Sequence, residues 1–106
     1  MLSFFTCLSC AANEANAVTV LGRHTCGEWV LHHQADSNSV EGVSEEGWLP
    51  GYLSGFAFAS NKNFLSGADP LSLLLWVSNY CRDNPIDYLA DAAAALAYEL
   101  IKRKGL

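Results

Sequence analysis

Apolar residues recur at helical spacing through most of the chain. Polar and helix-capping residues between them divide the pattern into four segments. Thr25-Cys26-Gly27-Glu28 has the form of a capping box, which predicts a helix that begins at Thr25 and ends near 36–38. Ser44, the acidic residues that follow it, and aromatic residues at spacing four predict a second helix over 45–60. Pro50 lies inside this segment and predicts a kink or a restart.

Two further segments complete the pattern. Asp69-Pro70 places a cap residue before a proline at the first helical position, and the third helix ends at Asn84-Pro85. This segment is apolar nearly all round, so we expect it to be the central and most buried element. A fourth helix is expected over 85–104, with an alanine-rich middle and a basic last turn. No β-hairpin signal competes, which predicts an all-α fold.

The length sets the domain organisation. A chain of 106 residues has room for one hydrophobic core, so we expect residues 18–106 to form a single helical domain. The fold predicted is a compact bundle of four helices, or five if residues 1–17 add one. With 51% hydrophobic and 16% charged residues, the composition is typical of a globular protein and excludes a disordered chain.

The N-terminal segment, residues 1–17, supports two interpretations. It is apolar and ends in Ala15-Asn16-Ala17, the small-x-small form of a signal-peptidase site, although a basic region is absent. Alternatively, apolar residues at helical spacing make it an extra amphipathic helix. The first interpretation predicts an exported protein.

The cysteines bear on the same question. Cys7 and Cys10 form a C-x-x-C, which lacks the second ligand pair of a zinc site and the βαβ context of a redox site. If residues 1–17 are removed, Cys26 and Cys81 remain as an even pair, as in an exported domain with one disulfide. Two buried free thiols are the alternative.

The charge pattern bears on the class of partner. The formal net charge is −5, and three of the six basic residues lie together at 102–104. Direct nucleic-acid binding needs clustered Lys and Arg, so it is disfavoured. No apolar run reaches the roughly 20 residues that a membrane crossing needs, so we expect neither nucleic acid nor membrane as a partner.

One histidine and acid series has the spacing of metal ligands. His24, Glu28 and His32 recur every four residues. The capping box would place His24 before the helix and engage Glu28 with the cap, so we expect no metal and no cofactor.

Two other patterns suggest chemistry only superficially. Ser54 directly precedes a glycine and does not fit the G-x-S-x-G of a nucleophile elbow. Asp83, Asp87 and Asp91 are typical of a solvated acidic face. No catalytic residue is therefore predicted, and we do not expect an enzyme.

The second predicted helix carries more aromatic side chains than one core can absorb. Surplus aromatic surface in an acidic protein is typical of a protein-binding face. The predicted binding residues are Trp48, Tyr52, Phe56 and Phe58.

Three motifs together resemble a group of small exported helical proteins of Proteobacteria: Thr25-Cys26-x-Glu28-Trp29, then Gly51-Tyr52-Leu53-Ser54-Gly55, then Tyr80-Cys81 before an alanine-rich helix. The group includes the HdeA acid-stress chaperones and the Rap/Tai immunity proteins of type VI secretion, and the resemblance covers residues 24–101. It implies a periplasmic helical domain in which Cys26 and Cys81 are bonded.

The resemblance also implies a mode of action. The chain is expected to be a non-enzymatic protein-binding module that sequesters a toxin, client or effector complex, with a homodimer as a further expectation. The alternative is an acidic inhibitor from a phage or mobile element, similar to anti-CRISPR proteins, that acts in the host-cell cytoplasm on a nucleic-acid-binding partner.

Overall fold

The computed structural model describes residues 18–22, 24–34 and 39–106, and within these ranges the protein is all-α. Its helices are α2 (Cys26–His32), α3 (Val40–Ser60), α4 (Pro70–Asp83) and α5 (Leu89–Lys104). The all-α prediction is confirmed. The predicted signal sequence or extra helix at 1–17 lies outside the described residues.

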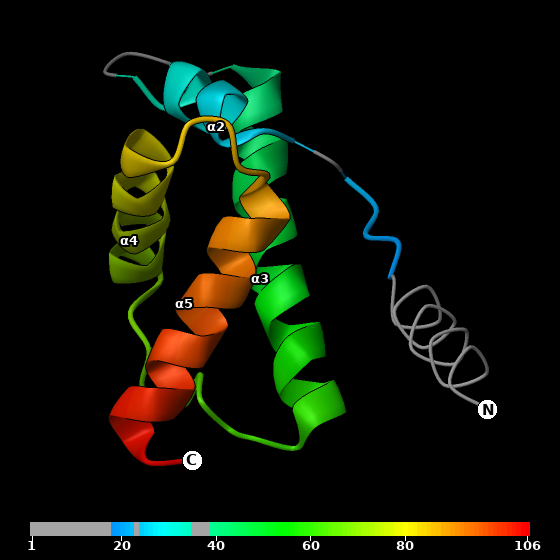
Figure 1. Cartoon of the computed structure of the whole chain (residues 1–106), viewed down its shortest axis with the longest axis vertical. Coiled ribbons are helices and arrows are strands. Elements are labelled where there is room, and N and C mark those ends of the chain that lie inside the picture. Colours follow the sequence, from blue (N-terminus) through cyan, green and yellow to red (C-terminus); the bar gives the residue numbers. More distant parts are fainter. Residues whose placement is uncertain (1–17, 23, 35–38) are drawn as a thin grey trace, which may run out of the picture.

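Helix α5 lies at the centre of the bundle, between α3 and α4, and α2 crosses one end (Figure 1). One face of α5 is fully buried, and its alanines let both neighbours approach; it consists of Leu89, Ala92, Ala93, Leu96 and Ala97. The prediction that the third segment is the most buried element is wrong. In α4 only Val77 and Cys81 are fully buried, because α5 and α2 cover one side of α4 and Leu71 and Leu75 remain exposed.

The first predicted helix begins where expected, but it ends earlier than predicted. Thr25 Oγ1 accepts the backbone N–H of Glu28, and the Glu28 carboxylate accepts the backbone N–H of Thr25, as in a capping box. The helix stops at His32, and the backbone N–H of His33 bonds back to Trp29 and Val30.

Helix α3 begins earlier than predicted. Ser39, rather than Ser44, is the N-cap and accepts the backbone N–H of Gly42. Gly42 lets this first turn pass close to α2, since a Cβ there would lie 3.1 Å from the His32 carbonyl oxygen. The helix runs continuously through Pro50, so the predicted restart does not occur.

The third predicted helix begins where expected, and the fourth begins later. Asp69 caps α4 and Pro70 occupies its first turn, as predicted. Helix α5 begins at Leu89, four residues later than Pro85, because residues 84–88 form a loop against α2 instead of a first helical turn. None of the four described helices combines the length and hydrophobicity that a membrane crossing requires.

Candidate protein-binding surface

A disulfide joins Cys26, at the start of α2, to Cys81, near the end of α4. The sulfur atoms are 2.10 Å apart, the Cα atoms are 4.7 Å apart, and both side chains are fully buried. The predicted pairing is confirmed, and the alternative of two free thiols is wrong.

The loop between α4 and α5 holds the start of α2 in place beside this disulfide. The backbone N–H groups of Cys26 and Gly27 donate to the carbonyl oxygens of Asp87 and Pro85, at 2.8 and 3.0 Å. Thr25 and Tyr88 form an isolated antiparallel bridge. These bonds satisfy N-terminal amides of α2 that have no partner within the helix. The end of the bundle that carries α2 is therefore fixed by both covalent and backbone contacts.

Three of the four predicted binding aromatics form a row along α3. Spacing by four places Trp48, Tyr52 and Phe56 on one side, where the first two rings stack at 5.0 Å. Phe56 then meets the edge of Tyr98 on α5 at 5.5 Å, and the Trp48 indole N–H donates to the Leu21 carbonyl at 2.9 Å. The row is half-buried and joins α3 to α5 and to the segment before α2.

Burial also affects Tyr52. Desolvation raises the pKa of its phenol, with smaller contributions from Tyr98 and Asp91. The remaining predicted aromatic, Phe58, is 89% exposed and stands apart from this row. The four side chains therefore belong to two different faces of α3.

The outer face of α3 carries a stripe of glycines at spacing four. Gly47, Gly51 and Gly55 are exposed, and a Cβ at any of them would meet nothing within 4 Å. These residues were not among the predicted binding residues. Within the described chain no helix packs on this stripe, which we call the glycine stripe.

An apolar groove of about 200 Å³ lies between α3 and α4, and Pro50 in its lining is three residues from Gly47 on α3. Apart from Glu46 its lining is apolar: Leu49, Pro50, Leu53, Pro70, Leu73 and Leu74. Leu71 and Leu75, also on α4, are 74% and 58% exposed. We call this feature the α3–α4 groove; sequence pattern alone does not reveal it, because it depends on α4 packing on α5 and α2 rather than on α3.

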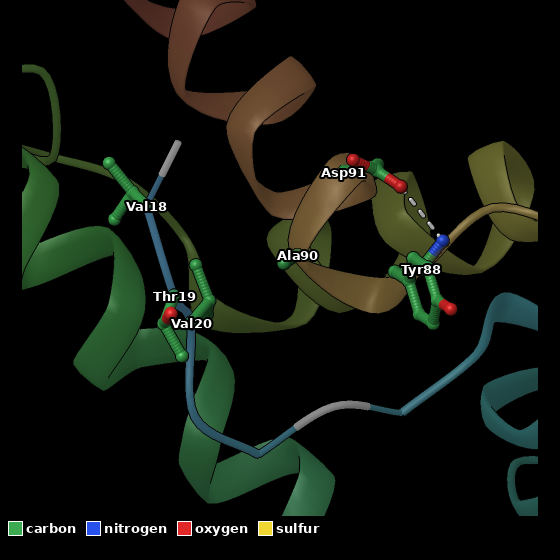
Figure 2. A pocket seen from close by; sticks show the side chains of 6 residues that line it. All are labelled: Val18, Thr19, Val20, Tyr88, Ala90 and Asp91. Atoms are coloured by element: carbon green, nitrogen blue, oxygen red, sulfur yellow. Dashed lines mark hydrogen bonds between the residues drawn. The ribbon is translucent and has the colours of Figure 1, made fainter. Parts of the chain in front are cut away.

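A second hollow, of about 340 Å³, lies where residues 18–20 pass the start of α5 (Figure 2). Its one acidic side chain, Asp91, points back to Tyr88 and accepts that residue's backbone N–H at 2.9 Å. This carboxylate therefore serves as the cap of α5.

Of the other two acidic residues of the predicted solvated face, Asp87 has a structural role. Asp87 accepts the Tyr80 hydroxyl hydrogen at 2.7 Å, and this bond raises the pKa of Tyr80 to about 12. Asp83 is exposed at the end of α4. Ser54 is exposed on α3.

The histidines gather around Glu45, which was not among the predicted site residues. Glu45 is fully buried, with His32 Nδ1 at 3.0 Å from its Oε1 and His24 Nδ1 at 3.4 Å from its Oε2. A sequence signal existed, since Glu45 lies at core spacing with Gly42 and Leu49.

Comparison of the chain with models of known protein families, with curated proteins and with solved structures finds no match.

Proposed function

We propose that the chain is a non-enzymatic periplasmic module that sequesters a partner protein, in the manner of an immunity protein or a chaperone. The observation that carries this proposal is the uncovered glycine stripe on α3, a helix that also lines the α3–α4 groove. Residues three apart are neighbours on the surface of a helix. Pro50, which lines the groove, lies three residues after Gly47, and Phe58 lies three residues after Gly55, so both side chains extend the surface of the stripe.

The exposed glycines have an energetic cost in the free protein. Glycine in a helix interior destabilises the helix by roughly 0.5–1 kcal/mol relative to alanine. Nothing in the described chain approaches Gly47, Gly51 or Gly55 closely enough to need a missing side chain. A partner segment that packs directly on the α3 backbone would need it, and the adjoining groove offers apolar surface to bury.

The disulfide supports a periplasmic location. Cys26 and Cys81 are bonded, and disulfides persist in oxidising compartments such as the periplasm. The resemblance to exported chaperones and immunity proteins, which rests on the motifs around these cysteines, favours the same location. An acidic surface, with a net charge of −5, also favours a protein partner over a nucleic acid.

The decisive experiment identifies the partner and then tests the surface. The oxidised chain is used to capture proteins from the periplasm of the organism that encodes it, and the captured protein is purified and titrated by calorimetry. Gly51→Leu fills the glycine stripe and should weaken binding by about tenfold or more, since about 1.4 kcal/mol corresponds to a factor of ten. Phe58→Ala should weaken it as well.

Asn63→Leu is the matched control, because it adds the same side chain at an exposed loop position outside the stripe. It should bind as the wild type does. Wild-type affinity in Gly51→Leu and Phe58→Ala would show that this surface is not the interface. A cytoplasmic, nucleic-acid-binding partner that takes up only the reduced chain would instead favour the inhibitor function.

A further inference from the structure

Three potential metal ligands converge where the segment before α2, α2 itself and α3 meet. His24 Nδ1 lies 3.4 Å from Glu45 Oε2 and 3.8 Å from Glu28 Oε2. All three ligand atoms lie within 4.8 Å of one another. Tetrahedral zinc with bonds of about 2.0–2.2 Å separates neighbouring ligand atoms by roughly 3.3–3.6 Å, so small side-chain adjustments bring this triad to zinc geometry.

The buried carboxylate of Glu45 is incompletely satisfied. The residue is fully buried, and within the described chain its Oε2 makes no hydrogen bond. A buried carboxylate oxygen without a hydrogen bond loses its hydration without compensation. This oxygen faces His24 Nδ1 at 3.4 Å, so an imidazole nitrogen and a carboxylate oxygen are placed where both can bind one cation.

Glu28 can cap the helix and bind a metal at the same time. Its Oε1 accepts hydrogen bonds from the Thr25 hydroxyl and backbone amide, at 3.1 and 3.4 Å. Its Oε2 faces His24 instead. The capping box therefore engages only one of the two carboxylate oxygens of Glu28, and the other is available to a metal ion.

A second histidine orients the buried acid. His32 Nδ1 lies 3.0 Å from Glu45 Oε1, and because a carboxylate can only accept, the imidazole donates. Such partners hold a ligating carboxylate in position. His32, which the sequence spacing placed among the ligands, thus becomes a positioning residue.

We propose that His24, Glu28 and Glu45 bind one Zn²⁺ ion, with water completing the coordination. One imidazole and two carboxylates form a donor set that zinc accepts. The Glu28 side chain is 48% exposed, which leaves an entry path for the ion. The ion would join α2 and the residue before it to α3. The disulfide, by contrast, joins α2 to α4. This site is independent of the proposed protein-binding surface.

The test uses the full chain with its disulfide formed, without a histidine tag, and with Cys7→Ser and Cys10→Ser so that these thiols cannot bind zinc. Calorimetric titration with ZnCl₂ should show one ion per chain, and thermal unfolding should shift to higher temperature with added zinc. MgCl₂ should have no such effect at the same concentration. Absence of saturable zinc binding would overturn the proposal.

Glu28→Gln is the sharpest variant, because glutamine preserves the capping box while removing the ligand charge. Glu28→Gln and Glu45→Gln should each weaken zinc binding by about tenfold or more. Glu46→Gln is the matched control, since Glu46 neighbours Glu45 but is not in the triad. Its zinc affinity should equal that of the parent chain.

Circular dichroism checks that every variant remains helical. Undiminished zinc affinity in both Glu28→Gln and Glu45→Gln would overturn the assignment of the ligands. An equal loss in Glu46→Gln would overturn it too, because the effect would then reflect general acidity.

Discussion

His32 and Glu45 meet through a contact of 3.0 Å between the imidazole Nδ1 and the carboxylate Oε1, and this contact joins α2 to α3. Helix α2 has only seven residues and cannot be stable alone. Its position depends on this contact, on the Cys26–Cys81 disulfide and on Trp29, whose indole N–H donates to Ser78 Oγ at 2.9 Å.

We expect Glu45→Ala to destabilise the protein in metal-free buffer by about 1–3 kcal/mol, because the His32 donor loses its acceptor in a part-buried site. Glu45→Gln keeps an acceptor oxygen and should cost less. Urea unfolding at neutral pH measures both. Equal losses in the two variants would contradict the hydrogen-bond explanation.

Loss of the disulfide should have a larger effect. Cys26 and Cys81 are 55 residues apart, and the chain-entropy model assigns a loop of this length roughly 4 kcal/mol. Cys26→Ala, Cys81→Ala and the double variant should lose similar amounts, since each removes the same bond. A reducing agent should lower the unfolding midpoint of the wild type but not of the double variant; an equal shift in both would refute this account.

The glycines should divide into two classes. Gly51→Ala and Gly55→Ala should each stabilise the free protein by roughly 0.5–1 kcal/mol, because their added Cβ atoms enter open space. Gly42→Ala should destabilise it, since its Cβ would lie 3.1 Å from both the His32 carbonyl oxygen and Ser39 Oγ. Thermal unfolding of the three variants tests this contrast, and a stabilised Gly42→Ala would contradict the packing described.

Tyr80 should make stability depend on alkaline pH. Its hydrogen bond to Asp87, with burial, raises the folded-state pKa from 10.0 to about 12. Between these values the unfolded chain releases the phenol proton while the folded chain retains it, so stability is complete below pH 10 and falls as the pH rises toward 12. The effect is attenuated by solvent because the ring is partly exposed.

Tyr80→Phe is the control for this prediction. It should lower stability at neutral pH by about 1 kcal/mol through the lost hydrogen bond. It should also flatten the decline between pH 10 and 12, the range of the shift. Denaturant unfolding at several pH values measures both effects. An unchanged slope in Tyr80→Phe would assign the decline to other groups.

Local signals in the sequence predicted the parts of the fold that depend on neighbouring residues. The Thr25–Glu28 capping box and the Asp69-Pro70 start involve groups three or fewer residues apart, so their chemistry is readable from the chain. The motif pattern around Cys26 and Cys81 also predicted their pairing, which the structure confirms.

The tertiary structure alone decided which faces meet. Helix α4 looked central because leucines surround it, yet α5 occupies the centre, since its buried alanines let helices approach on both sides. For the same reason an acid at a core position, Glu45, is buried among histidines, and Gly51 faces open space. Sequence by itself determined which segments are helical and where α2 and α4 begin, through interactions along a few residues. Burial depends on contacts between segments that only the packed bundle brings together.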